Sequence, residues 1–257
     1  MLNEPVGTLS PPPHAPTGAV RVQGADAVRF LQGQLSNDIE RLRPDEPLYA
    51  GLHNPQGRVI ALLRLFLLAP DDVLGVLPRE LAAPVAARLA KYVLRAKAKV
   101  TDASGDPVLM SSSAFAETPV ADRIAAGLPQ VYAATSEQFV AQMLNLDVIG
   151  AISFTKGCYT GQEVIARAHY RGRVKRRMQR FRTNGPAQLA IGGTGTLRDG
   201  RSFRVVEAVA LDDGRTEFLA VAPLAHGGDE AAEDSAGGAA ATLLDAEQLT
   251  LPYELPA

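Results

Sequence analysis

Two Asp-Gly dipeptides in the last third of the chain constrain its fold more than any other feature. They lie at 199–200 and 213–214, between three runs that are typical of β-strands. Asp-Gly between such runs is a strong hairpin signal, because glycine readily takes the positive φ that a tight hairpin turn requires. The pattern predicts a small antiparallel barrel or sandwich over residues 183–257. The three runs span 195–197, 202–211 and 216–221.

The first two thirds of the chain mix helical and strand patterns, which is typical of an α+β domain. We expect residues 19–182 to form this body, since 257 residues allow one large domain or two modest ones. Residues 1–18 are rich in proline and are expected to be a flexible arm. The stretch 227–241 consists mainly of alanine, glycine and acidic residues, and we expect a mobile loop there. Strands are expected at 19–22, 49–53, 58–68, 73–77 and 97–101, and helices at 26–35, 78–92, 122–127 and 136–144.

Composition excludes several classes of protein. A chain with 46% hydrophobic and 21% charged residues is not wholly disordered, and a net charge of -2 does not by itself favour a nucleic-acid binder. The single cysteine, Cys158, excludes an internal disulfide and indicates a reducing compartment. The N-terminus has no signal-peptide pattern. The most apolar stretch, 59–69, is interrupted by Arg64 and is shorter than the roughly 20 residues of a membrane helix. We therefore expect a cytoplasmic protein with no membrane partner.

Charge is unevenly distributed along the chain. Residues 167–182 contain eight Lys or Arg and no acid, whereas residues 183–257 contain twelve acids and four arginines. Such a basic stripe can bind an anionic partner, although a run of charges is more often a solvated face.

The segment from Lys156 to Arg167 is the strongest candidate for chemistry. Thr160 and Glu163 match the Thr-x-x-Glu capping box, which predicts a helix from Gly161 onward. Cys158 then lies just ahead of a helix N-terminus, and Lys156 is two residues away. Both features favour the thiolate, which is the reactive and metal-binding form of cysteine. The alternative is that Cys158 is a small buried hydrophobe.

Neighbouring residues suggest a binding surface. Glu163 and Arg167 can pair on the helix, and Arg167 with Arg171 could grip a carboxylate or phosphate from one face. Asn37 and Asp38 lie in a polar turn after the first helix, and a simple helix exit would also explain them. The four histidines are scattered, so a metal site made by this chain alone is not expected, although Cys158 could be a transient iron–sulfur ligand.

The segment from Lys156 to Glu163, followed by Ala166-Arg167 and 170–172, resembles the signature of the YgfZ-type folate-binding proteins. These are relatives of the glycine-cleavage T-protein, an aminomethyltransferase. The segments 30–38, 91–97 and 143–147 also resemble that family, so the similarity extends from about residue 19 to residue 177.

The resemblance implies an α+β, T-protein-like body with a central opening, plus a small C-terminal antiparallel β-barrel. It implies a role in assembling or repairing iron–sulfur clusters, including those of tRNA-modifying enzymes. Tetrahydrofolate is the implied ligand, and the partners would be iron–sulfur client enzymes or assembly proteins. Cys158 would be the functional thiol with Lys156 beside it. The implied binding residues are Gly157, Tyr159, Gly161, Gln162, Glu163, Arg167, Arg171, Asn37 and Asp38.

Two departures from the family weaken folate binding. Ala125 stands where T-proteins hold the pterin with a glutamate, and the chain has no tryptophan on which a pterin could stack. The stretch 58–69 also lacks the acidic residue of the aminomethyltransferases. We therefore expect an accessory role rather than catalysis. The alternatives are a folate-dependent one-carbon (aminomethyl) transferase, and a tRNA-binding module that uses the stripe from Arg167 to Arg182.

Overall fold

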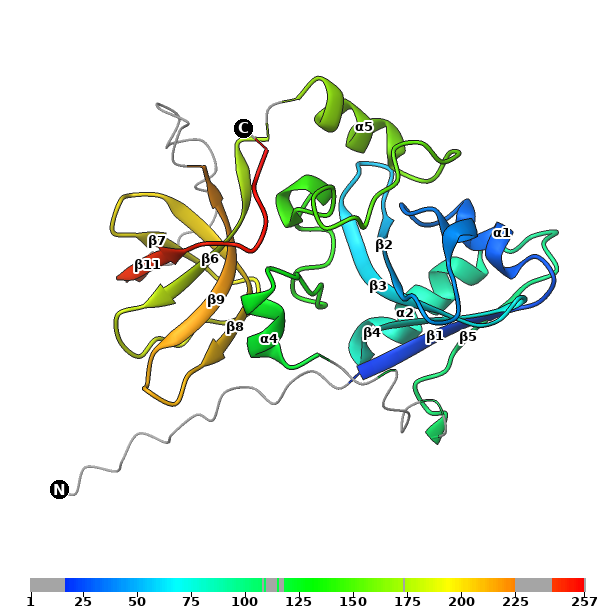
Figure 1. Ribbon diagram of the computed structural model, residues 1–257, viewed down its shortest axis with the longest axis horizontal. Helices are drawn as coiled ribbons and strands as arrows, with labels where there is room; N and C mark the ends of the chain where they lie inside the picture. Colours follow the sequence, from blue (N-terminus) through cyan, green and yellow to red (C-terminus); the bar gives the residue numbers. More distant parts are fainter. Residues whose placement is uncertain are drawn as a thin grey trace.

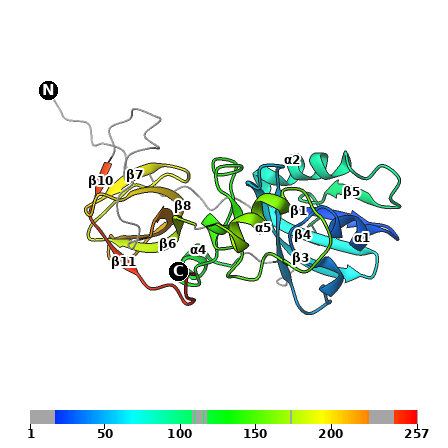
Figure 2. The ribbon, with the colours of Figure 1, turned by 90° about the horizontal axis from the view of Figure 1, so that it is seen from above.

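The protein is built around two β-sheets that lie side by side (Figures 1 and 2). The computed structural model describes residues 17–107, 109, 115, 118–172, 174–224 and 242–256. The expected loop at 227–241, and residues 1–16 of the expected arm, lie outside the described residues. Among the described residues, no helix is both long and apolar enough to cross a lipid bilayer.

The first sheet has five strands in the order β2-β3-β4-β1-β5, and all neighbouring pairs are antiparallel. Helix α2 (Arg79–Ala90) packs against β1 and β5, and buries Leu81, Val85 and Leu89. The short helices α1 (Ala27–Gln32) and η1 (Ile39–Arg41) follow the first strand. The strands are β1 (Thr17–Gln23), β2 (Leu48–His53), β3 (Val59–Ala69), β4 (Asp72–Pro78) and β5 (Lys99–Asp102).

The second sheet has six strands in the order β10-β7-β8-β9-β6-β11 and forms a nearly closed barrel. Its two outermost strands are separated by only Asp245 in the sequence, which brings the opposite ends of the sheet together. One pair, β10 with β7, is parallel, so the barrel is not wholly antiparallel as expected. The strands are β6 (Arg176–Thr183), β7 (Thr194–Leu197), β8 (Ser202–Ala210), β9 (Thr216–Pro223), β10 (Thr242–Leu244) and β11 (Ala246–Leu249).

Both Asp-Gly hairpins form as predicted. Gly200 and Gly214 have φ of +86° and +81°, and each follows an aspartate whose carboxylate accepts the backbone N–H two residues on. The rings of Phe181, Phe203 and Phe218 pack together inside the barrel.

The chain between the two sheets contains α4 (Val120–Ala125), the short η3 (Ala141–Leu144) and α5 (Gln162–Tyr170). The helix expected at 136–144 is wrong except for η3. Residues 133–138 form turns instead, and the backbone N–H of Glu137 and the carbonyl of Phe139 both pair with Val59 of β3. Sheet pairing satisfies these backbone groups, which a helix would have done locally.

Strand β6 was not anticipated. Its four arginines lie within the basic stripe, and the strand starts at Arg176, ahead of the domain boundary expected near Arg182. Partly buried arginines need carboxylates with which to form ion pairs. In β6 these carboxylates come from distant parts of the chain.

Candidate functional site

Cys158 is exposed on the loop that leads into α5. The helix starts one residue later than expected, at Gln162, and its N-cap is Gly161 with φ of +82°. The capping box of Thr160 and Glu163 does not form. Instead the side-chain oxygen of Gln162 accepts the backbone N–H of Tyr159 at 3.3 Å.

Gly161 is required by a close contact with the turn between β2 and β3. A Cβ atom at this position would lie 2.5 Å from the carbonyl oxygen of Asn54 and 3.1 Å from the Cα of Gly57. The first distance is shorter than any normal Cβ contact and the second is tight, and positive φ adds strain for any residue with a Cβ. Gly157, by contrast, faces open space. The hairpin turn therefore fixes where α5 begins, and with it the position of Cys158.

Lys156 anchors the other end of the same loop. Its ammonium donates to the backbone carbonyls of Gln32, Leu35 and Asn37, the last two at 2.6 and 2.9 Å. Burial lowers the pKa of Lys156 to about 8, against the opposing effect of nearby carboxylates. All three donors of the ammonium face the protein, so Lys156 is a positioning residue that binds the loop to the end of α1.

Asn37 and Asp38 lie beside Lys156, and their polar atoms also face the protein. The amide of Asn37 donates to the carbonyls of Tyr49 and Gly150, both at 2.7 Å, and its oxygen accepts the N–H of Asp38. A carboxylate oxygen of Asp38 accepts from the amide of Gln32 at 2.9 Å. This polar turn is a hydrogen-bonded network, and Lys156 binds the Cys158 loop to it.

Sequence reasoning missed His53, which is fully buried near Tyr159. The two rings are 6.2 Å apart, and the ammonium of Lys156 lies 5.2 Å from the centre of the Tyr159 ring. Burial raises the pKa of Tyr159 to about 12 and lowers the pKa of His53 to about 3. Neither ring nitrogen of His53 has a hydrogen-bond partner among the described residues. A single histidine at the end of a strand gives no indication in the sequence that its ring is buried without a hydrogen-bond partner.

The outer face of α5 carries charge and aromatic rings. Glu163 and Arg167 form the helix pair that the sequence allowed, at 2.9 Å, with both side chains mostly exposed. Arg171 is exposed at the helix end and has no acidic partner in the described part of the chain.

Aromatic rings gather at the end of the same helix. Phe154 stacks on His169 with ring centres 3.8 Å apart, and Tyr170 packs edge-on against both. The sequence analysis also missed this aromatic cluster. Phe154 lies outside α5, so the hydrophobic periodicity of the helix does not include it.

The basic stripe is not one continuous cationic surface. Arg177 forms a buried ion pair with Asp147 at 2.9 Å. Arg180 and Arg182 both pair with Glu217, at 2.7 and 2.5 Å. Arg173 lies outside the described residues. Three of the eight cations are therefore neutralised by acids that sit far away in the sequence.

The depression beside α4, where Ala125 stands, is small. A depression of about 40 Å³ lies between β2, β3, β4 and the segment around α4, which is room for about three waters. Ligand pockets for larger molecules are roughly 300–1,000 Å³. Ala125, on α4, is exposed and offers no carboxylate. This depression, as it is arranged here, does not fit a pterin.

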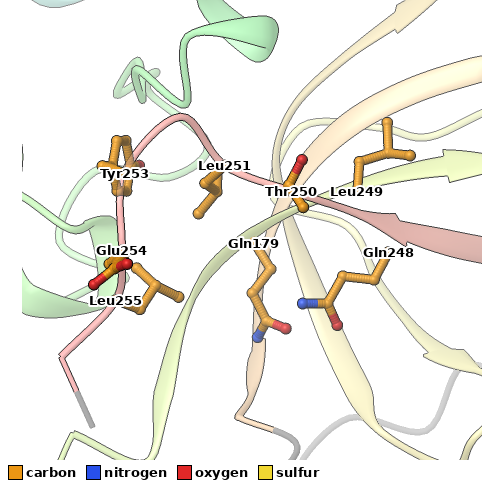
Figure 3. A pocket seen from close by; sticks show the side chains of 8 residues that line it. All are labelled: Gln179, Gln248, Leu249, Thr250, Leu251, Tyr253, Glu254 and Leu255. Atoms are coloured by element: carbon orange, nitrogen blue, oxygen red, sulfur yellow. The ribbon is translucent and has the colours of Figure 1, made fainter.

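A larger hollow of about 390 Å³ lies at the edge of the barrel, between Gln179 of β6 and the C-terminal segment that contains Tyr253 and Glu254 (Figure 3). None of its lining residues is among the expected site residues. In the described ranges, no three His, Cys, Asp or Glu side chains gather closely enough to hold a metal ion.

No protein-family model matches the chain. A protein of Haemophilus influenzae, described only as uncharacterized, is 31% identical over 230 residues, covering 75% of this chain and 82% of that protein. The tRNA-modifying protein YgfZ of Enterobacter sp. is 28% identical over 76% of this chain and 79% of its own length. The protein of that name from Escherichia coli is 26% identical over 79% of this chain and 87% of its own length.

Among solved structures, the fold is similar to the glycine cleavage system aminomethyltransferase T of Bartonella henselae. The TM-score is 0.62 at 14% sequence identity, and the match covers 81% of this chain and 76% of that one. At this identity the likeness concerns the fold alone.

Proposed function

This chain belongs to the family of the tRNA-modifying protein YgfZ, and on that premise we propose that it is an accessory protein for the assembly or repair of iron–sulfur clusters. It acts through the thiol of Cys158. One observation carries the proposal: the exposed thiol stands on a loop that is held at both ends, by Lys156 on the carbonyls of α1 and by Gly161 on the hairpin turn.

A thiol held in this way is suited to exchange with a partner. The thiolate can donate one ligand to a cluster in transit. It can also attack a disulfide of a partner, which forms a mixed disulfide and releases the other sulfur as a thiolate. The other ligands of a cluster would come from the partner or a small thiol, since the described residues of this chain gather no further ligand set. The partners are iron–sulfur client enzymes or assembly proteins.

Binding of tetrahydrofolate has less support than the role of Cys158. The similarity to YgfZ and to the T-protein fold makes a folate ligand plausible, whereas the depression beside α4 is too small and Ala125 supplies no acceptor. We assign no step to a folate. For the same reason, and because the stretch 58–69 contains no acid, a one-carbon transferase is the less supported alternative.

The test is complementation of a bacterium that lacks its own YgfZ. The chain would be supplied intact, as Cys158→Ser, and as Thr155→Ala, a control on the same loop. The activity of an iron–sulfur tRNA-thiolating enzyme would be assayed in each strain. We expect the intact chain and the control to restore activity and Cys158→Ser to fail. Equal rescue by Cys158→Ser would contradict the role of the thiol, and failure of the intact chain would contradict the function itself.

A second candidate function is RNA binding, and it rests on the outer face of α5. Exposed Tyr170 and Arg171 lie beside the stacked rings of Phe154 and His169. Rings that stack on bases and arginines that contact phosphates are the usual elements of single-stranded RNA binding. Filter binding of tRNA at two salt concentrations tests it. Tyr170→Ala and Arg171→Ala should each weaken binding roughly tenfold. No binding of the intact chain at low salt would end this candidate.

A further inference from the structure

The turn between α2 and β5 exposes two large hydrophobic side chains to solvent. It lies on the side of the five-stranded sheet that faces away from the barrel (Figures 1 and 2). Leu94 is 88% exposed and Tyr92 is 49% exposed, and Leu94 is the most exposed large hydrophobic residue described. Leu94 in particular is almost wholly exposed, so its side chain adds little to the core of this chain.

The backbone of Leu94 is strained as well. Its φ is +38°, in the left-handed region that glycine and asparagine tolerate and that leucine rarely adopts. Val93, the residue before it, packs against the core. A glycine would make the same turn at less cost. The strain of the leucine is not offset by burial within this chain, and uncompensated strain of this kind is concentrated at functional sites.

The surroundings of Leu94 are positively charged. Lys91, Arg95, Lys97 and Lys99 are all exposed, and no acid occurs between residues 88 and 101. Arg88, on the adjoining turn of α2, is paired with Glu137 at 3.8 Å. The carboxylate of Asp26 contacts the turn and accepts the backbone N–H of Lys97.

We propose that this turn, residues 91–97, is a docking surface for a protein partner with an acidic surface and an apolar pocket that receives Leu94. The inference rests on the proposed function, because the partner would be the iron–sulfur client or assembly protein that Cys158 serves. An exposed Leu94 surrounded by cations fits such a surface. Burial of the Leu94 side chain supplies affinity, and the charges set the orientation of the partner and raise the association rate.

The same features disfavour other occupants. An aliphatic tip has no planar face on which a base could stack, so RNA would gain little from Leu94. A lipid surface would gain from the lysines, but two apolar side chains are too few for stable anchoring, since even a single acyl chain binds membranes only marginally.

The direct test measures the affinity of the intact chain for a purified iron–sulfur tRNA-thiolating enzyme. Leu94→Gly is the informative variant, because glycine relieves the strained φ while removing the apolar tip. We expect its melting temperature to be unchanged or raised and its affinity to fall roughly tenfold or more. Leu94→Met should keep most of the affinity. Leu243→Ala, which truncates a leucine that is 67% exposed on the barrel, should keep all of it.

The charges are tested separately with the double variant Lys91→Glu/Arg95→Glu. It should bind more weakly and lose most of the salt dependence of the intact chain, whereas Arg198→Glu on the barrel should not. Parallel titrations with total tRNA and with anionic phospholipid vesicles identify the other occupants. The proposal is overturned if Leu94→Gly binds the enzyme as the intact chain does, if the intact chain does not bind it, or if Leu94→Gly weakens only tRNA or vesicle binding.

Complementation separates this inference from the function on which it rests. Loss of rescue by Cys158→Ser together with full rescue by Leu94→Gly would overturn the docking surface and leave the thiol function standing. Full rescue by both variants would overturn the proposed function.

Discussion

Arg123 of α4 and Glu207 of β8 form a buried ion pair that joins the two halves of the protein. The guanidinium donates to the two carboxylate oxygens at 2.5 and 3.3 Å, and the two side chains are only 6% and 2% exposed. The hydroxyl of Tyr132 donates to the same carboxylate. Glu207 follows a shift of register between β8 and β9, which disrupts the regular pairing of the strand where this carboxylate lies. The contact between body and barrel is therefore polar and specific at this point.

Removing one partner of this pair should be costly. Arg123→Met leaves the carboxylate of Glu207 buried without its cation, and we expect the free energy of unfolding to fall by about 3–5 kcal/mol. The double variant Arg123→Met/Glu207→Leu should lose much less, because neither charge is then left unpaired. Urea denaturation of the two single variants and the double variant measures this coupling. A loss below about 1 kcal/mol in the single variants would show that the pair does not hold the halves together.

The two glycines that flank Cys158 should respond differently to substitution. Gly161→Ala places a Cβ 2.5 Å from the Asn54 carbonyl at a positive φ, so we expect a loss of about 2 kcal/mol or more. Gly157→Ala adds a Cβ in open space, and we expect a change within about 0.5 kcal/mol. Thermal melting checks stability, and the alkylation rate of Cys158 by iodoacetamide reports whether the loop has moved. Equal effects of the two substitutions would contradict this account of the loop.

Lys156 should act through position rather than through chemistry. Lys156→Met leaves the carbonyls of Gln32, Leu35 and Asn37 without their donor, which should cost about 3 kcal/mol. Lys156→Arg should not fully compensate, because a planar guanidinium cannot direct three donors to a converging set of carbonyls. Hydrogen exchange at the end of α1 should accelerate in both variants. The exposed Arg41→Met is the control, and unchanged exchange in Lys156→Met would refute the anchoring role.

His53 should make stability depend on pH below neutrality. Burial lowers its pKa from 6.5 to about 3, so between these pH values the unfolded chain binds a proton that the folded chain does not. The free energy of unfolding therefore falls as pH decreases through this window, by up to about 1.4 kcal/mol per pH unit from this residue. His53→Leu should flatten the slope between pH 6 and pH 4 relative to the intact chain. Parallel slopes for the two proteins in urea denaturation would contradict the prediction.

Local chemistry accounts for the parts of the fold that the sequence predicted well. The Asp-Gly hairpins depend on residues that are adjacent in the chain. The strands of the first sheet and helix α2 follow hydrophobic periodicity, and the structure matches them to within a few residues. The signature around Cys158 likewise indicated the family before the fold was known.

Long-range contacts account for the differences. The expected capping box of Thr160 and Glu163 does not form, and the residue that precedes α5 is Gly161, which lies against the Asn54 carbonyl. Residues 136–144 had a helical pattern, but their backbone is paired with Val59 of β3. Each of these outcomes depends on a group more than 75 residues away, and no local pattern could indicate it.

By itself the sequence determined the α+β body, the hairpins of the barrel, the family, and the place of Cys158 ahead of a helix. Only the tertiary structure decided what the charged and polar residues do. It turned Lys156, Asn37 and Asp38 inward as supports of the loop, and it neutralised Arg177, Arg180 and Arg182 with distant acids. It also left Leu94 exposed and strained. The physical reason is that hydrophobic periodicity and turn chemistry act over a few residues, whereas the partner of a buried charge can come from any part of the chain.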